Sequence, residues 1–440
     1  MIQKIPSASL CDNLVYNFCH VVPTILQGTF TKRRFWVGFW TRVHRDPAAV
    51  RFVSRLRKKY GCDYLWIRLG ITKSLLVLDP KGIEHILERS PFVYADGKPK
   101  RDGMNVFQPN AVTISRGTEW RDRRRFNEAV LDSGQSLHRY ASRFLQIIQN
   151  EIVPGTGPPP TLQSWDDFDD LFARITRQII FGTAARNDTT ITGLLKKMMR
   201  ESNRARKPKK SKYFDEFYSR IGDYLDTAEP NTLGALCRQV PSTKRTQVEN
   251  QIPHWMFAMW ETLGTNTVRA LALIAAHPRV QEAVRREMAG ADLTTTAGID
   301  SLKLLEGCVE EAMRLWPTTP ILVRETVPVA ELGDEAIPDG TQVLILNSFN
   351  HRDRQRYPLA DTFAPESWSN GSPNPLFNHL GSGLQACAGK DLALFIAKAV
   401  LATLFSGHRY VLVKPALDPN RPMPHAYNYF HVHFSCTRES

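Results

Sequence analysis

The sequence predicts a mainly α-helical protein with a minor β region. Helical patterns dominate from Thr118 to about residue 316, whereas short β-strand patterns are confined to residues 63–79, residues 327–347 and the C-terminal end. The apolar fraction of 42% is ordinary for a globular chain, and 440 residues are enough for a large core. Because no clear linker interrupts the helical region, these observations favour one large domain.

The first elements of that domain are predicted to be a helix, two strands and a short helix. Residues 46–61 have a helical pattern that ends at Gly61, a residue typical of helix C-termini. The runs DYLWIRLG and SLLVLD are rich in strand formers and are bounded by Gly70 and Pro80, which is typical of β-strands. The run PKGIEHILERS then indicates the short helix.

Residues 1–40 are predicted to form an N-terminal segment that precedes a single domain of residues 41–440. The run 14–28 is too short and too polar to span a bilayer. The run 30–40 mixes aromatic residues with cations. Two interpretations of this run stay open: a peripheral contact with a membrane surface, or packing beneath the fold.

Charge and cysteine content restrict the partners and the compartment. The net charge of +13 favours an acidic partner, an anionic membrane or nucleic acid. The basic run 204–214 is irregular and contains Pro208, as a solvated loop does, and no nucleic-acid-binding motif accompanies it. We therefore expect no nucleic-acid partner. The seven cysteines are scattered without a CxxC pair, which favours the reducing cytoplasm over a disulfide framework.

One cysteine, Cys387, lies in a glycine-rich stretch that precedes an apolar helix, FNHLGSGLQACAGKDLALF (377–395). Residues 390–407 are apolar on nearly all sides, which predicts a buried helix. A helix N-terminus carries partial positive charge, so we expect it to lower the pKa of the Cys387 thiol. A thiolate fixed to a buried helix is a suitable metal ligand, although a buried structural cysteine is the simpler alternative.

This stretch resembles the haem-binding loop of the cytochromes P450, FxxGxRxCxG. Gly383, Cys387 and Gly389 match the motif, and the resemblance implies that Cys387 is the thiolate ligand to haem iron. Leu380 stands where phenylalanine is usual. Gln385 stands where a cation usually binds a haem propionate, and it can donate a hydrogen bond but carries no charge. The haem loop is therefore divergent.

A second stretch, VEEAMRLWPTTPILVR from Val309, is similar to the family's ExxR motif. Glu311 and Arg314 are three residues apart on one face of a helix, among apolar residues that suggest burial. The resemblance gives this pair a structural role beside the haem and makes Arg324 a propionate ligand. In APESW (364–368), Ser367 stands where the family's third partner, an arginine, is expected. Candidate substitutes for that arginine are His351, Arg352 and Arg354.

A third stretch, GTEWRDRRRFNEAVL (117–131), has the WxxxR pair that reaches haem propionates in the family. Trp120 and Arg124 lie four residues apart on one helix face, and both side chains can donate to a carboxylate. The neighbouring arginines, Arg121, Arg123 and Arg125, would then point elsewhere, toward solvent, where an acidic electron donor could dock.

A fourth stretch, residues 254–280, is predicted to be the long central helix of the family. Alignment on His277-Pro278 places Ala258, Glu261 and Thr262 on the oxygen-activation motif. A threonine hydroxyl can pass a proton and an adjacent acid can resupply it from solvent. On an α-helix the two side chains would point about 100° apart. The simpler alternative is that Thr262 bonds back to the carbonyl four residues earlier.

These motifs together imply a bacterial-type, soluble cytochrome P450 of secondary metabolism that is cytoplasmic or peripheral to a membrane. Its haem b would lie between the central helix and the helix after Cys387. The implied reaction inserts one atom of O2 into a small, largely apolar substrate, with electrons from a separate partner such as a ferredoxin and its reductase. Alternatives are a rearranging, coupling or peroxide-driven haem-thiolate enzyme and a non-catalytic haem- or ligand-binding protein. The expected pocket residues are His254, Phe257, Met259, Ile321 and Leu322, of which Met259 replaces the glycine usual in the central-helix motif.

Overall fold

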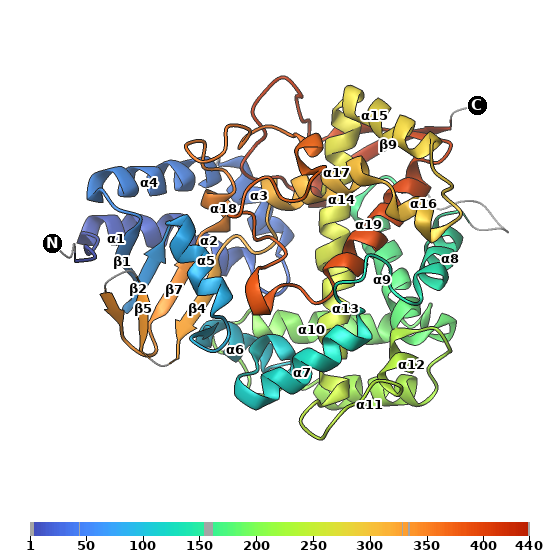
Figure 1. Ribbon diagram of the computed structural model, residues 1–440, viewed down its shortest axis with the longest axis horizontal. Helices are drawn as coiled ribbons and strands as arrows, with labels where there is room; N and C mark the ends of the chain where they lie inside the picture. The colour runs from blue at the N-terminus through green and yellow to red at the C-terminus, as the bar shows by residue number, and fades with distance from the viewer. Residues whose placement is uncertain (1–3, 44, 154–161, 328, 333–334, 439–440) are drawn as a thin grey trace.

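The computed structural model describes residues 4–43, 45–153, 162–327, 329–332 and 335–438 and confirms the mainly helical class (Figure 1). The α-helices are α1 (Leu10–Tyr16), α2 (Val22–Gln27), α3 (Arg34–Arg42), α4 (Arg45–Tyr60), α5 (Pro80–Glu88), α6 (Lys98–Met104), α7 (Gly117–Val130), α8 (Ala141–Ile152), α9 (Trp165–Phe181), α10 (Thr189–Ser202), α11 (Phe214–Asp226), α12 (Leu233–Cys237), α13 (Ile252–Phe257), α14 (Gly264–Ala276), α15 (Pro278–Ala289), α16 (Thr296–Asp300), α17 (Lys303–Leu315), α18 (Asn347–Asn350) and α19 (Lys390–Phe405).

Short helical turns and β-strands complete the described chain. The 3-10 turns are η2 (Val112–Ile114), η3 (Thr183–Ala185), η4 (Val248–Asn250), η6 (Pro365–Trp368), η7 (Gly383–Gln385) and η8 (Tyr429–His431), and the π-helical turns are η1 (Asn17–Val21) and η5 (Ala258–Leu263). The strands are β1 (Tyr64–Leu69), β2 (Thr72–Val77), β3 (Tyr94–Asp96), β4 (Leu322–Thr326), β5 (Ala330–Leu332), β6 (Glu335–Ile337), β7 (Gln342–Ile345), β8 (His408–Lys414) and β9 (His433–Arg438).

The larger sheet has the strand order β1-β2-β7-β4-β3 and lies to one side of the helices (Figure 1). Strands β2 and β7 pair in parallel, and the other neighbours are antiparallel. The pairing of β3 with β4 sets Asp96 opposite Arg324. The expectation that strands return only from residue 327 was wrong, because β4 begins at Leu322. The charged residues of β4 hide its strand character in the sequence, since their partners lie on distant segments.

The core of the helical part is built around α14 and α19, which run side by side near the centre of Figure 1. The prediction of a buried helix after Cys387 is confirmed: α19 is buried along nearly its whole length from Leu392 to Phe405. Even Lys398 is buried, with its ammonium group 2.6 Å from a Glu306 carboxylate oxygen. The burial of α19 fixes the position of the loop that enters it.

The N-terminal segment is fastened to the sheet and to the helical part. The side-chain amide of Asn17 donates to the Arg68 carbonyl at 2.6 Å, and Tyr16 is fully buried. The backbone N–H groups of Thr29 and Phe30 donate to Asn203, which follows α10. Within the described residues, no helix combines the length and hydropathy needed to cross a bilayer.

Candidate functional site

The cysteine loop is held in place by its own backbone and by α5. The Cys387 N–H donates to the Leu380 carbonyl at 2.8 Å. Gly383 has a φ of +64°, and a Cβ there would lie 2.3 Å from the Leu87 carbonyl oxygen. Gly383 is therefore required both by its left-handed backbone and by its close approach to α5. Figure 1 shows the loop, in orange-red, passing α5 before it enters α19.

The Cys387 thiol combines accessible surface with close protein surroundings. Its side chain has accessible surface, yet burial raises the pKa of its thiol. The Gly389 N–H bonds to the sulfur, and this bond and the positive charge of Arg124 favour the thiolate without outweighing burial. The prediction of a lowered pKa was wrong for this reason. A coordinated metal ion removes the thiol proton in any case.

The two candidate haem-binding residues on α7, Trp120 and Arg124, lie in different surroundings. Arg124 donates to the Ala386 carbonyl at 2.6 Å and to Glu128 at 2.6 Å. Trp120 is buried, and its ring meets Phe92 edge to face. Arg124 thus contacts the residue before Cys387, whereas Trp120 stands one helical turn earlier.

The expectation that the other three arginines of α7 point to solvent holds for Arg121 and Arg125, which are exposed. It was wrong for Arg123. This residue is buried and donates to the Arg245 carbonyl, Ser115 and Asn110. The three arginines occupy alternate positions, so each points about 200° away from the next along the helix and all three cannot face outward.

The candidate propionate ligands on β4 and the cysteine loop converge on a carboxylate of the chain itself. Arg324 lies 3.1 Å from the carboxylate of Asp96, to which Gln385 donates at 3.2 Å and Lys100 at 2.7 Å. Burial opposes the ionisation of Asp96, but Lys100 and Arg324 lower its pKa. Arg324 and Gln385 are therefore engaged by Asp96. Sequence reasoning missed Asp96, whose partners come from residues 100, 324 and 385.

The Glu311–Arg314 pair is fully buried on α17. The Arg314 Nε lies 2.5 Å from one Glu311 oxygen, and its Nη2 lies 2.9 Å from the other. Arg314 also donates to the Ala360 and Thr362 carbonyls. A bidentate pair whose remaining donors are satisfied by carbonyls locks α17 to the loop at residues 359–364.

The third partner of this pair is a tryptophan. The Trp368 indole N–H donates to Glu311 at 2.9 Å. The expectation that His351, Arg352 or Arg354 replaces the missing arginine was wrong: Arg352 and Arg354 both pair with Asp361, and His351 contacts the Arg314 carbonyl. Ser367 bonds to the Ala364 carbonyl. An indole N–H supplies one directed bond to the carboxylate without adding a buried charge.

The central helix is continuous from α13 to α14 but contains a π-helical turn, η5, at residues 258–263. Such turns occur often at functional sites. Glu261 and Thr262 both line the same cavity. The expectation that they diverge by 100° assumed a regular α-helix, whereas a π turn is wider and brings neighbouring side chains closer in direction. The simpler alternative for Thr262 was a hydrogen bond from its hydroxyl to the carbonyl four residues earlier. On this helix such a bond is made by Thr267, whose hydroxyl donates to the Leu263 carbonyl at 2.9 Å.

Glu261 contacts the N-terminal segment. The Thr31 hydroxyl lies 3.1 Å from its carboxylate, and Lys32 provides a backbone N–H bond. Burial raises the pKa of Glu261 to about 7, although these hydrogen bonds act in the opposite direction. Burial also lowers the pKa of Lys32, to about 8, against the attraction of Glu261. Both groups thus titrate near neutral pH.

Some of the predicted pocket residues line the cavity and others do not. Phe257 and Ile321 line the cavity together with Glu261 and Thr262. His254 is enclosed, meets the Phe257 ring edge to face and has a pKa lowered to about 4 by burial. Met259 is packed in the hydrophobic core, and Leu322 begins β4. Ala258 begins the π turn.

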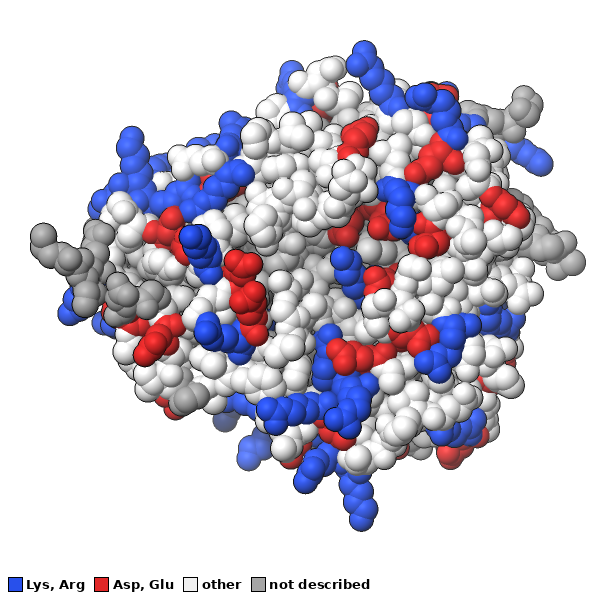
Figure 2. Space-filling model, viewed as in Figure 1, with Lys and Arg blue, Asp and Glu red and all other residues white. Residues whose placement is uncertain are grey.

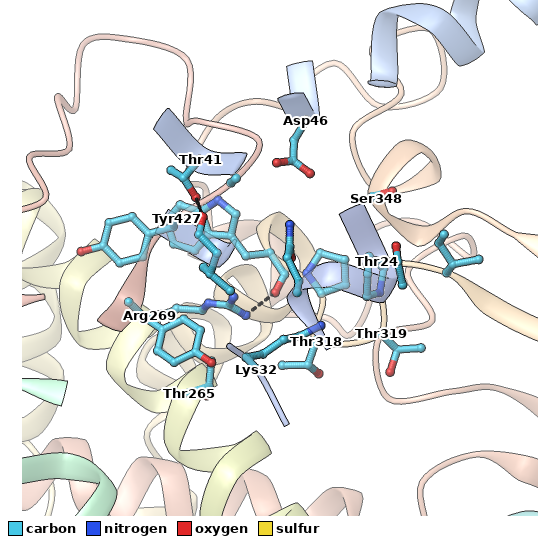
Figure 3. Close-up of a pocket in the computed structure, with 18 of the residues that line it drawn as sticks. Thr24, Lys32, Thr41, Asp46, Thr265, Arg269, Thr318, Thr319, Ser348 and Tyr427 are labelled. Carbon is cyan, nitrogen blue, oxygen red and sulfur yellow. Dashed lines mark hydrogen bonds between the residues drawn. The ribbon is translucent and has the colours of Figure 1, made fainter. Parts of the chain in front are cut away.

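The cavity has a volume of about 260 Å³ and is more polar than the sequence suggested (Figure 3). Its walls come from the N-terminal segment, the central helix, residues 315–321 and residues 425–429. Charged and hydroxyl side chains are frequent among them, so the expected bulky and mostly apolar lining describes only part of the wall. The polar lining residues include Thr24, Lys32, Thr41, Arg45, Asp46, Thr265, Arg269, Thr318, Thr319 and Ser348.

The residues around Cys387 fit a haem group. A thiol that keeps accessible surface and accepts an N–H bond on its sulfur is suited to ligate iron. Arg124 lies beside the loop, where its guanidinium can donate to a carboxylate of the haem. The turn η5 of the central helix contacts α19, the helix that follows Cys387.

Comparison with known proteins identifies the family. The sequence profile of the cytochromes P450 matches residues 164–424. Cyclooctat-9-en-7-ol 5-monooxygenase of Streptomyces melanosporofaciens is 23% identical over 79% of this chain and 82% of its own length. Cytochrome P450 714C2 of rice is 32% identical, but the match covers 36% of this chain and about a third (32%) of the rice protein.

The fold agrees with this assignment. A cyanobacterial CYP120A1 with bound retinoic acid superposes with a TM-score of 0.72 over 88% of this chain and 94% of its own, at 16% sequence identity. The profile match alone covers more than half of the 440 residues. The chain therefore belongs to the cytochrome P450 family, whose members are haem-thiolate monooxygenases.

Proposed function

We propose that this protein uses haem b to insert one oxygen atom from O2 into a small organic substrate, with electrons from a separate redox partner. The observation that carries the proposal is the Cys387 thiol, which has accessible surface just before α19 and accepts the Gly389 N–H on its sulfur. The Streptomyces relative, which is named for oxidation of cyclooctat-9-en-7-ol, supports a small organic substrate of secondary metabolism.

In this proposal the haem is held by residues of three elements. Cys387 would supply the thiolate ligand to iron, Arg124 and Trp120 on α7 would donate to one propionate, and Arg324 would share its charge between Asp96 and the other. The bound haem would supply the reductive activation of O2 that side chains cannot perform. The Gly389 N–H would hold the sulfur in position and reduce its basicity.

Glu261 and Thr262 would manage protons on the opposite side of the site. A carboxyl with a pKa of about 7 can release and regain a proton at neutral pH. Its partner Thr31 can accept that proton and pass one on, since a hydroxyl both donates and accepts. Thr262, the next residue, would present its hydroxyl to the reacting oxygen.

The redox partner would dock on the face that carries the cysteine loop. Figure 2 shows basic side chains gathered over α7 on this face. Arg121, Arg125 and Lys390 are exposed there, and Lys390 begins α19 just after Cys387. A positive patch near the ligand loop suits an acidic ferredoxin, because opposite charge increases the association rate.

The N-terminal segment would also make a peripheral contact with an anionic membrane. Along α1 to α2, Leu10, Leu14, Phe18 and Ile25 follow one another at helical spacing and are 74%, 65%, 64% and 56% exposed. Removal of such an apolar stripe from water is favourable by about 25 cal/mol per Å² of buried surface. The exposed cation Arg42 at the end of α3 would favour anionic lipid.

The test of the haem assignment is Cys387→Ser. We expect the variant to lose the red-shifted band that the reduced carbon monoxide complex of a thiolate-bound haem gives. Cys308→Ser is the matched control, since Cys308 is buried on α17 and its thiol lies away from the loop. Retention of the band in Cys387→Ser would overturn the assignment. A normal band together with product formation in the wild type would support it.

A further inference from the structure

The cavity beside Thr262 has more positive than negative charge. Its lining includes the cations Lys32, Arg45 and Arg269 and the acids Asp46 and Glu261. Arg45 and Asp46 pair at 2.9 Å and neutralise each other. Because the pKa of Glu261 is about 7, this residue supplies only about half a negative charge at neutral pH. The remaining charge is carried by Lys32 and Arg269.

Arg269 is the less satisfied of these two cations. One of its N–H groups donates to the Trp316 carbonyl at 2.6 Å, and its guanidinium lies 5.1 Å from the centre of the Tyr429 ring. Its Nε atom is buried without a hydrogen-bond partner, and no carboxylate in the described part of the chain lies within ion-pair distance. Burial lowers its pKa to about 10, so it stays charged at neutral pH.

Lys32 brings a second cation to the same region. Its ammonium group donates to the Gly28 carbonyl at 2.8 Å. Both cations line the cavity and repel each other, whereas Glu261 attracts Lys32. Figure 3 shows the ends of both side chains converging in the lower part of the cavity, near the hydroxyl-bearing residues Thr318 and Thr265.

An enclosed pair of cations that repel each other is unfavourable without an anion. A buried charge without a partner destabilises the folded protein. An apolar ligand would leave this cost in place, and a cationic ligand would increase it. An anionic ligand would remove the repulsion and give the guanidinium a planar partner.

We propose that the substrate of this enzyme carries a carboxylate group, which Arg269 and Lys32 bind in the cavity beside Thr262. This inference rests on the proposed function and names the class of its substrate. Arg269 follows Thr262 by seven residues, which places the carboxylate about 10 Å along the helix from the threonine. The cavity hydroxyls would complete the coordination of the carboxylate oxygens.

The experiment compares acids with neutral molecules of the same shape. Decanoic and cinnamic acids and their amides are titrated calorimetrically, without electron donor, into the full-length haem-loaded protein. We expect at least one acid to bind about tenfold more tightly than its amide, since a hydrogen-bonded charge contributes about that much. Arg269→Gln and Lys32→Gln should each remove most of this preference. Arg286→Gln, which changes an exposed arginine on α15, should leave it unchanged.

Two results would overturn the proposal. In the first, both acids bind no more tightly than their amides, or do not bind at all. In the second, Arg269→Gln and Lys32→Gln both keep the full preference for acid over amide. Should Arg269→Gln fail to fold, Lys32→Gln on the N-terminal segment gives the comparison by itself. The carbon monoxide band of each preparation reports thiolate ligation separately. Failure of the haem assignment is thereby distinguished from failure of the carboxylate site.

Discussion

Glu261 is a carboxyl whose charge changes near neutral pH, and this has a consequence for stability. Burial raises its folded-state pKa to about 7 from an ordinary 4.5. The unfolded chain therefore loses this proton first, so stability falls as pH rises from 4.5 to about 7 and is level above that range. We expect Glu261→Gln to remove this loss.

The measurement is the thermal midpoint of the wild type and of Glu261→Gln at about pH 5 and about pH 8. Other titrating groups are common to both proteins and cancel in the comparison. The variant should gain stability relative to the wild type at the higher pH. Glu249→Gln, on the 3-10 turn η4, is a control in a different environment. An equal pH dependence in wild type and Glu261→Gln would show that Glu261 is ionised throughout this range.

Thr262 is expected to affect how efficiently electrons are used rather than how haem is bound. In Thr262→Ala, haem content and reduction should be unchanged, because the side chain faces the cavity and is not part of the core. Product per NAD(P)H should fall severalfold and hydrogen peroxide should rise, since a positioned proton donor is lost.

The control for this prediction is Thr267→Ala on the same helix, whose hydroxyl is bonded to a backbone carbonyl. Its coupling of product to NAD(P)H should match that of the wild type. The role assigned to Thr262 would be wrong if both variants remained fully coupled.

At the level of single residues, the sequence predicted groups whose partners are local. Glu311 and Arg314 are three residues apart on one helix, so their pairing follows from helical geometry. Trp368 could not be predicted as their partner, because 57 residues separate it from Glu311. Arg269 gave no signal either, since its importance comes from the absence of a carboxylate near it in the described structure.

At the level of elements, periodicity predicted the helices well and their irregularities poorly. The helix predicted over 254–280 is present, but the π turn within it depends on tertiary packing and has no distinct sequence pattern. The predicted helix 46–61 corresponds to α4, which ends at Tyr60 before Gly61 with a φ of +64°. The end of a helix at glycine depends on local sequence, whereas the π turn depends on contacts with distant segments.

The apolar stripe of α1 and α2 leads to a prediction about membranes. The variant Leu14→Ser/Phe18→Ser should bind vesicles that contain phosphatidylserine at least about tenfold more weakly than the wild type, since each side chain loses about 1.5–3 kcal/mol of burial. Binding is measured by co-sedimentation of the full chain with the vesicles.

The control changes two exposed valines on β8, Val411→Ser/Val413→Ser, which are 47% and 52% exposed. This pair should leave vesicle binding unchanged. A membrane contact through this stripe would be ruled out by either of two results. The wild type does not sediment with the vesicles, or both double variants lose binding equally.

At the level of the whole molecule, the basic patch around the cysteine loop should determine the rate of electron delivery. The variant Arg121→Glu/Arg125→Glu should slow haem reduction by an acidic ferredoxin about tenfold or more at low salt. The difference should shrink at high salt, because exposed charges are screened. Stopped-flow measurement of haem reduction tests this expectation.

The matched control is Arg51→Glu/Arg55→Glu on α4, an exposed pair with the same spacing. It changes the net charge equally but lies on a different helix, so a specific docking patch predicts little change in rate. Equal slowing by both pairs would indicate a general effect of net charge and would contradict docking at α7.

The walls of the polar cavity divide into two groups by their place in the chain. Phe257, Glu261, Thr262, Arg269 and the turn at 315–321 fall within the stretch that matches the family profile, whereas residues 20–46 and 425–429 fall outside it. The proposed carboxylate site therefore joins one cation from each group, Arg269 from the profile stretch and Lys32 from the segment before it. A lineage that exchanged its N-terminal segment would keep Arg269, Glu261 and Thr262 while it lost or replaced the second cation.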